Sequence, residues 1–439
     1  MRMYDIINRK KHGYALTDDE IRFFVEGFTK SEIPDYQASA LLMAICLKGM
    51  DENETAVLTD AMLHSGDAAD LSSIPGVKVD KHSTGGVGDK TSLIIGPIVA
   101  SCGVPVAKMS GRGLGFSGGT VDKLESIPGL RTEIGSERFR AIVRQTGIAI
   151  IGQSGNIAPA DKKIYALRDV TATIESLPLI ASSIMSKKLA AGSDAILLDV
   201  KTGSGAFMKT LDDSIALAQA MVSIGSRSSR RVMAVITDMD APLGNAIGNA
   251  LEVEEAVDTL QGHGPDDLTS VCVELASYML LLAGVAKDIK ECRKLSQGAI
   301  KSGEALNKLH AMVEAQGGDV SALERGLAKA PLMTPFTAAT SGYITGMNAE
   351  MCGMASLALG AGRARKEDSI DYGAGLILKK KTRDRVEVGE TIALMYTSES
   401  GRFRDAKESL SSAVSIGDAP PHPVKTVLAA VSEQGVTML

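Results

Sequence analysis

Short apolar runs alternate with helical stretches through the middle of the chain, and this alternation limits the fold more than any other feature of the sequence. Each run has the length and composition of a buried strand. Because helical stretches separate the runs, we expect parallel strands in a sheet covered by helices. The sequence therefore predicts an α/β fold with strands at residues 77–79, 104–108, 148–151, 195–200 and 232–237.

Helices without intervening strands are predicted in two separate segments. Within residues 1–70 we expect helices at 4–10 and 36–47. A further helix should begin at the capping pair Thr17 and Glu20, and another at Asp51. Residues 161–191 also contain only helical patterns and are long enough to pack on the N-terminal helices. We predict one small, discontinuous all-helical domain formed by residues 1–70 and 161–192.

The rest of the chain is expected to form a larger unit. Residues 71–160 and 193–335 would build the α/β domain around a central, mostly parallel sheet. A passage rich in Gly, Pro and Thr near residues 331–335 marks a boundary. Beyond it, residues 336–439 are predicted to form a C-terminal α+β portion, with residues 386–390 as a turn between two strands.

Bulk composition excludes several classes of protein. A net charge of −6 with well-mixed charges argues against a nucleic-acid surface. No apolar run approaches the roughly 20 residues of a membrane span, and the N-terminus lacks the apolar core of a signal peptide. The five cysteines are scattered without metal-ligand spacing. We expect a soluble, cytoplasmic protein with free thiols and no membrane partner.

A polar, glycine-rich stretch follows the first predicted strand and precedes an apolar helix. In residues 81–92, Lys81 supplies a positive charge, Ser83 a hydroxyl, and Ser92 lies in the first turn of that helix. The glycines allow the backbone to approach an anion. Asp89 interrupts the Gly-Lys-[Ser/Thr] run of a nucleoside triphosphate loop, so a single phosphate is the expected ligand.

A second polar loop, residues 108–120, follows the next strand. It contains Lys108, Ser110 and Thr120, and we expect the two strand ends to converge on one anion. The loop also contains one Gly-x-Gly-x-x-Gly match, which is weak evidence for a dinucleotide when it stands alone. These two loops predict an enzyme that handles phosphate.

The helical insertion contributes a third polar group. Arg168 lies on one predicted helix, while Ser183 and Lys187 share a face of the next because they are four residues apart. The neighbours are apolar, and a buried lysine needs a partner or a ligand. His82 beside Lys81 is compatible with either a structural or a catalytic role.

Three long strings of this sequence resemble the thymidine and pyrimidine-nucleoside phosphorylases. They are Lys81-His-Ser-Thr-Gly-Gly-Val-Gly-Asp89, Ser110-Gly-Arg-Gly-Leu-Gly115 and Tyr165-Ala-Leu-Arg-Asp169. The resemblance covers nearly the whole chain. It implies a homodimer with an active-site cleft between the domains, and reversible phosphorolysis of uridine, thymidine or deoxyuridine to free base and (deoxy)ribose 1-phosphate, without an organic cofactor.

The resemblance also implies residue roles. The catalytic residues would be His82, Arg168 and Lys187. Phosphate would be bound by Lys81, Ser83, Ser92, Lys108, Ser110 and Thr120. The pyrimidine would be bound by Tyr165, Arg168, Ser183 and Lys187. A potassium ion would be held by carbonyls of Gly88, Lys90, Leu243 and Ala246 and by the carboxylate of Glu255.

Some positions depart from the family pattern. Phe116 stands where relatives have histidine, and Ser117 where they have threonine. Lys90 stands where the relatives considered have a neutral residue, and an ammonium there would weaken or displace a cation. The sequence therefore leaves open whether potassium binds.

Several alternatives remain at this level. One is a thymidine-selective phosphorylase, and another is phosphorolysis of a nucleoside monophosphate, which would need a further basic cluster. A phosphoribosyltransferase similar to the anthranilate enzyme shares the first loop and the domain layout, but it would need acidic residues for magnesium. A non-enzymatic carrier built around the C-terminal turn is a third class.

Overall fold

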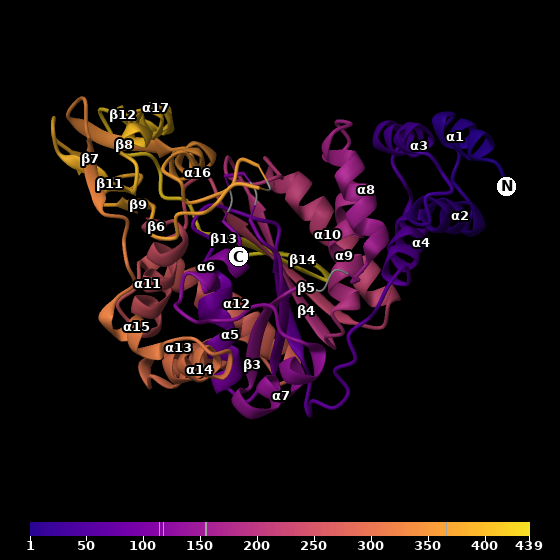
Figure 1. Cartoon of the computed structure of the whole chain (residues 1–439), viewed down its shortest axis with the longest axis horizontal. Helices are drawn as coiled ribbons and strands as arrows, with labels where there is room; N and C mark the ends of the chain where they lie inside the picture. The colour runs from indigo at the N-terminus through magenta and orange to yellow at the C-terminus, as the bar shows by residue number, and fades with distance from the viewer. Residues whose placement is uncertain (114, 117, 154–155, 366) are drawn as a thin grey trace.

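The computed structural model describes residues 1–439 except 114, 117, 154, 155 and 366. Figure 1 shows the N-terminal helices at one end, the main sheet with its helices in the middle, and most of the C-terminal portion at the other end. The C-terminus itself lies in the middle because the last strands rejoin the main sheet.

The helical domain begins with α1 (Met3–Lys11), α2 (Asp18–Thr29), α3 (Asp35–Lys48) and α4 (Glu52–Leu63). The predicted capping pair is confirmed: Thr17 accepts from the Glu20 backbone N–H, and Glu20 accepts from that of Thr17. Asp51 and Glu54 form the same reciprocal cap on α4. The predicted insertion is helical as well and forms α8 (Pro159–Asp169) and α9 (Leu177–Ala190).

The helix α9 contributes to two hydrophobic clusters. Leu179, near its start, packs in one cluster with residues of α1 to α4 and with Ile164 of α8. Met185 and Leu189, further along, pack in another cluster with residues of the main sheet and of α10 (Leu211–Arg227). This helix therefore joins the helical domain to the sheet through its own side chains.

The main sheet has the strand order β1-β4-β5-β13-β14. Its first three strands, β1 (Val79–Ser83), β4 (Ala195–Thr202) and β5 (Arg231–Asp238), are parallel, as predicted. The strands β13 (Val427–Ser432) and β14 (Gly435–Met438) are antiparallel. A second parallel pair, β2 (Val106–Ser110) and β3 (Ile148–Gly152), lies beside β1, where the Val79 N–H donates to the Pro105 carbonyl at 3.2 Å.

The first strand extends further than the sequence predicted. Lys81, His82 and Ser83 belong to β1 and pair with Leu197, Leu198 and Asp199 of β4, so the expectation that they lie in a loop was wrong. Their polarity resembles that of a loop in the sequence alone. Inside the protein, Asp199 supplies the opposite charge that permits these residues to continue the strand.

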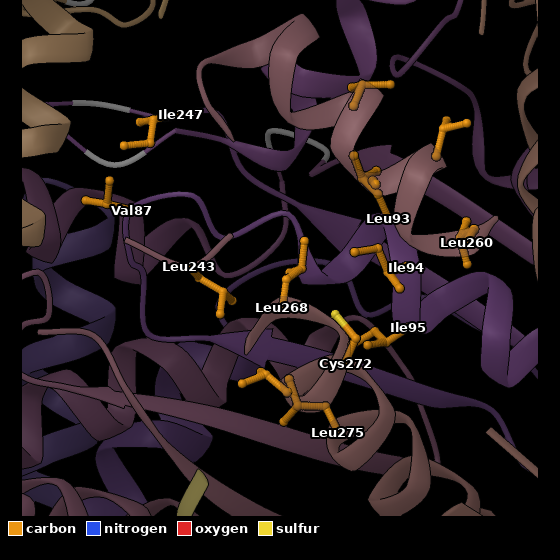
Figure 2. Packing of buried hydrophobic residues seen from close by; sticks show 14 of the residues in the cluster. Val87, Leu93, Ile94, Ile95, Leu243, Ile247, Leu260, Leu268, Cys272 and Leu275 are labelled. Atoms are coloured by element: carbon orange, nitrogen blue, oxygen red, sulfur yellow. The ribbon is translucent and has the colours of Figure 1, made fainter. Parts of the chain in front are cut away.

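Most helices of the α/β domain share one large hydrophobic cluster with the sheets, while Phe139, Ile142 and Val143 pack in a smaller one. Figure 2 shows Leu93, Ile94 and Ile95 of the apolar helix α5 within that cluster. The region after residue 265 is helical and forms α12 to α14. The helices are α5 (Thr91–Ser101), α6 (Thr120–Glu125), α7 (Ser136–Thr146), α11 (Asn249–Leu260), α12 (Asp266–Ala283), α13 (Ile289–Lys301), α14 (Glu304–Ala315) and α15 (Val320–Arg325).

The C-terminal portion contains two small sheets, ordered β6-β9-β11-β7 and β10-β8-β12. The expected turn at 386–390 joins β10 to β11, which lie in different sheets. The elements are β6 (Ala246–Ile247), β7 (Leu332–Thr337), β8 (Gly342–Met347), α16 (Ala349–Ala358), β9 (Gly375–Leu378), β10 (Arg385–Val386), β11 (Thr391–Thr397), η1 (Ser400–Arg402), α17 (Phe403–Ala413) and β12 (Val414–Gly417).

The boundary predicted between residues 335 and 336 falls inside β7. This strand lies at the edge of its sheet, where Pro335 is tolerated because one side of the strand needs no ladder hydrogen bonds.

Among the described residues, no helix combines the length and the apolar character needed to cross a membrane.

Candidate active site

Lys81 lies in a buried network of opposite charges at the end of β1. Its side chain is 1% exposed, and its Nζ lies 2.8 Å from Asp199 Oδ2 on the neighbouring strand. Lys81 also donates to Thr91 Oγ1 at 2.6 Å, and Ser83 donates its hydroxyl to Asp89. Although burial works against the ammonium form, Asp199 and Asp89 hold the pKa of Lys81 above its usual value. Lys81 therefore remains a cation.

Further lysines join this network from β2, α9 and β4. Lys188 lies 2.9 Å and Lys108 3.5 Å from the carboxylate of Asp80, and Lys201 lies 2.8 Å from that of Asp199. Lys108 also donates to the backbone carbonyl of Lys81. The buried lysines 81, 108, 188 and 201 share the carboxylates of Asp80, Asp89 and Asp199, so the positive charges exceed the negative ones by one. An excess positive charge inside the protein favours an anionic ligand.

The pKa of Lys108 identifies the least satisfied cation of this network. Burial, reinforced by Lys188 and Lys81 and only partly opposed by Asp80, lowers the pKa of Lys108 to about 8. An anion bound beside Lys108 would stabilise its charged form. Phosphate binding and protonation of this lysine should therefore favour each other.

This linkage gives a pH-dependent prediction. Below about pH 8 Lys108 is charged and the affinity for sulfate, which stays a dianion over this range, should be constant. Above that pH the affinity should fall by up to about tenfold per pH unit, because binding then requires uptake of a proton. Calorimetric titration from neutral to alkaline pH measures this change. A Lys108→Met variant should bind sulfate weakly without a step near pH 8, and the same step in that variant would contradict the assignment.

The predicted hydroxyl groups lie at the ends of the same elements. Ser92 is in the first turn of α5, Ser110 is the last residue of β2, and Thr120 is the first residue of α6. The carboxyl ends of β1 and β2 and the amino ends of α5 and α6 are the parts of an α/β fold that bind phosphate. The two loops thus follow neighbouring strands, as predicted.

The residues predicted to hold the pyrimidine form a second cluster on α8 and α9. Lys187 Nζ lies 2.6 Å from Asp161 and 2.9 Å from Ser183 Oγ. The Tyr165 ring centroid lies 5.7 Å from the Arg168 guanidinium and 5.9 Å from Lys187 Nζ. The structure therefore brings all four predicted base-binding side chains together, with Asp161 as an additional member.

Arg168 is fixed by its own backbone surroundings. Its guanidinium donates to the carbonyls of Thr173, Ile174 and Leu179 at 2.7 to 3.2 Å. A guanidinium has five N–H donors, so two remain for a ligand. The side chain is 1% exposed, which leaves it rigid and desolvated.

His82 is the third residue for which the resemblance implies a catalytic role. It follows Lys81 on β1, and burial followed by the charges of Lys188, Lys108 and Lys187 holds the pKa of His82 well below its usual value. The pair between Lys188 of α9 and Asp80 of β1, at 2.9 Å, places α9 beside this part of β1. His82 is therefore neutral near pH 7 and can donate one hydrogen bond without carrying a charge.

The residues implied for potassium also come together, but a lysine occupies the space between them. Lys90 Nζ lies 3.0 Å from the Leu243 carbonyl, 2.9 Å from that of Ala246, and in contact with the carboxylate of Glu255. Gly88 offers its carbonyl to the Lys90 backbone N–H. The ammonium that was expected to weaken or displace a cation therefore lies among the acceptors that the resemblance implies for that cation.

Phe116 packs on the C-terminal portion of the chain. Its carbonyl and Cβ lie so close to Gly353 of α16 that a side chain at that glycine would collide with both. Gly115, just before it, donates to the carbonyl of Arg363. Position 117, the other departure, lies outside the described residues.

Sequence reasoning missed the buried carboxylates and two of the lysines. No sequence motif assigned a role to Asp80, Asp199, Lys188 or Lys201. One signal was available, because Asp199 interrupts an otherwise apolar run of a strand predicted to be buried. A charge in such a run needs a partner of opposite charge.

The family models that match this helical bundle and this mainly parallel sheet are those of glycosyl-transferring enzymes. Family models match in three parts: the glycosyl transferase helical bundle domain at residues 4–66, the glycosyl transferase a/b domain at 76–306, and the pyrimidine nucleoside phosphorylase C-terminal domain at 343–417. The chain belongs to the pyrimidine-nucleoside phosphorylase family.

Similar proteins cover nearly the whole chain. A pyrimidine-nucleoside phosphorylase of Geobacillus stearothermophilus is 55% identical over 96% of this chain and 97% of that protein. Those of Staphylococcus epidermidis and Staphylococcus aureus are 55% and 54% identical, over 96% and 95% of this chain and 98% and 97% of their own lengths. An anthranilate phosphoribosyltransferase from Thermus thermophilus shares the fold at 20% identity and a TM-score of 0.58, over 71% of this chain and 99% of that one.

Proposed function

We propose that this protein catalyses the reversible phosphorolysis of pyrimidine nucleosides to free base and (deoxy)ribose 1-phosphate. The observation that carries the proposal is that consecutive residues of α9 join the two clusters: Lys188 pairs with Asp80 of the anion-binding network at 2.9 Å, and Lys187 belongs to the cluster with Tyr165, Arg168 and Ser183. The family and the names of the similar proteins support the same reaction.

The reaction needs opposite charges on the two sides of the sugar. A phosphate oxygen attacks C1′, the N-glycosidic bond breaks, and its electron pair leaves with N1 of the pyrimidine. The lysine network holds the phosphate in line, and its negative charge stabilises the cation-like sugar. Arg168 and Lys187 stabilise the departing pyrimidine anion, and neutral His82 donates a hydrogen bond to it.

The test is release of free base in the presence of inorganic phosphate. Thymidine, uridine, deoxyuridine and inosine are incubated separately with the protein, and the bases are separated by chromatography. We expect phosphate-dependent release from the three pyrimidine nucleosides and none from inosine. Release from inosine alone would overturn the pyrimidine assignment.

The base-release assay, together with one assay for anthranilate consumption, distinguishes the alternatives. Release from thymidine and deoxyuridine but not from uridine would indicate a phosphorylase selective for deoxyribose, and release from thymidine alone a thymidine-selective one. Consumption of anthranilate with phosphoribosyl pyrophosphate and magnesium would indicate the phosphoribosyltransferase. The names of the relatives favour the broader pyrimidine specificity.

The protein is further proposed to act as a homodimer through its helical domain. Tyr36 and Leu47 of α3 are 74% and 72% exposed, and Tyr4 of α1 is also exposed. Large apolar side chains gathered at one end of a molecule are typical of a protein interface.

The protein is also proposed to act in the cytoplasm. The five free cysteines are compatible with this reducing compartment.

A Leu47→Asp variant should therefore be monomeric where the wild type is dimeric. A charge placed in the centre of an apolar interface would remain desolvated without a partner. Analytical ultracentrifugation measures the change, and Lys48→Asp, on the next exposed position, controls for added negative charge. A dimeric Leu47→Asp variant would place the interface elsewhere.

A further inference from the structure

The side chain of Lys90 has a complete set of acceptors. Its ammonium has three N–H donors, and the surroundings offer three acceptors: the Leu243 carbonyl at 3.0 Å, the Ala246 carbonyl at 2.9 Å and the Glu255 carboxylate. The residue is fully buried at 0% exposure. Two carbonyls and a carboxylate are also what a hard monovalent cation would take as ligands.

The space around the ammonium is closed on its other sides. A Cβ added at Gly244 would lie 3.0 Å from Lys90 Nζ and 2.3 Å from Glu255 Oε2. One added at Gly88 would lie 2.4 Å from the Leu243 carbonyl oxygen. Glu255 also accepts from the backbone N–H groups of Asn245 and Ala246. The ammonium and a potassium ion therefore could not occupy this position together.

Residues 84–90, between β1 and α5, form the first anion-binding loop. The contacts of Lys90 connect this loop to the segment 242–246. The Leu243 N–H donates to the Val87 carbonyl at 3.1 Å, and Figure 2 shows Val87, Leu243 and Ile247 in the large hydrophobic cluster. On the same segment, Lys381 donates to the carbonyls of Pro242 and Gly244 at 3.0 and 2.9 Å. Lys90 and Lys381 thus donate hydrogen bonds to four backbone carbonyls of this short segment.

We propose that the ammonium of Lys90 is a built-in monovalent cation, which takes the position of the potassium ion implied by the family resemblance and holds the first anion-binding loop without any bound ion. An ammonium and a potassium ion have the same charge and similar size, but the ammonium is covalently attached and is always present. This inference concerns loop fixation and does not rest on the proposed reaction.

The wild-type protein provides the first test. Its thermal midpoint is measured by calorimetry in equal concentrations of potassium chloride and of tetramethylammonium chloride, whose cation is too large for the site. We expect midpoints equal within about 1 °C, because a ligand that does not bind adds no stability. A crystal soaked in thallium(I), which scatters anomalously and replaces potassium, should have no peak among the three acceptors.

A Lys90→Thr variant should convert the position into a true ion site. Removing the ammonium leaves the carboxylate of Glu255 buried without its cation, so potassium should raise the midpoint of this variant by about 3 °C or more over tetramethylammonium. Thallium(I) should then give a peak between Leu243, Ala246 and Glu255.

Two further variants serve as matched controls. Lys90→Met keeps most of the side-chain volume without the charge, so its midpoint should fall equally in both salts. Lys123→Thr removes another buried lysine, which lies 2.8 Å from Glu252 and donates to the Asp89 carbonyl. It should lose stability without a gain specific to potassium.

Three results would overturn the inference. They are a wild-type midpoint raised by potassium over tetramethylammonium, a thallium peak at this position in the wild type, and a folded Lys90→Thr variant that neither binds thallium here nor gains stability from potassium. If that variant does not fold, the two wild-type measurements decide the question.

Discussion

Replacement of Lys187 by alanine should lower kcat/KM for thymidine and uridine by roughly 10²-fold or more, because a preorganised charge opposite the leaving pyrimidine is lost. The structure fixes this ammonium between Asp161 at 2.6 Å and Ser183 at 2.9 Å, with the Tyr165 ring beside it. Little reorganisation is therefore needed when the base departs. Steady-state phosphorolysis of both nucleosides measures the loss.

The control is Lys163→Ala, which removes a partly exposed lysine of α8. Lys163 donates to the carbonyl of Phe28 and to Ser31, both within the helical domain, and no hydrogen bond or ion pair among the described residues joins its side chain to the four base-binding side chains. Its variant should keep kcat/KM within a few-fold of the wild type. Near-normal turnover by Lys187→Ala would remove this residue from the mechanism.

Replacement of Asp199 by alanine should cost about 3–5 kcal/mol in the free energy of unfolding, the range found when one partner of a buried ion pair is removed. Its carboxylate lies 2.8 Å from both Lys81 and Lys201, and Thr237 donates to its other oxygen at 2.7 Å. Without it, two ammonium groups would remain buried beside each other. Urea unfolding followed by circular dichroism measures the change.

Asp194→Ala is the matched comparison. Asp194 lies just before the same strand and pairs with Lys78 at 2.8 Å, but its side chain is partly exposed to solvent. An exposed pair contributes at most about 1 kcal/mol, so this variant should lose far less stability. Equal losses for the two variants would show that the buried position of Asp199 has no special role.

Local signals in the sequence predicted most of the fold. Apolar runs separated by helices predicted that β1, β4 and β5 are parallel. The capping pair Thr17 and Glu20 predicted where α2 begins. Fixed spacing likewise placed Ser183 and Lys187 on one helix face, one turn apart, whereas Tyr165 and the base-binding roles came from the family resemblance. These features depend on neighbours in the chain, which the sequence displays directly.

The features that sequence reasoning missed depend on residues distant in the chain. The extension of β1 through Lys81 to Ser83 needs Asp199, more than a hundred residues away, to balance the charge. The contact of the Lys90 side chain with Glu255 joins residues equally distant. The family resemblance implied the residues that surround Lys90, but it did not place the Lys90 side chain among them.

The two clusters to which α9 contributes restrict how the active site can close. Leu179 is held by the N-terminal helices, while Met185 and Leu189, on either side of Lys187, are held by the sheet and α10. Close-packed interiors resist continuous deformation. Any shift of the N-terminal helices relative to the sheet must therefore repack one of these two clusters. Arg168 donates to the Leu179 carbonyl of α9 and Lys187 pairs with Asp161 of α8, so these two cations keep their arrangement only when α8 and α9 shift together.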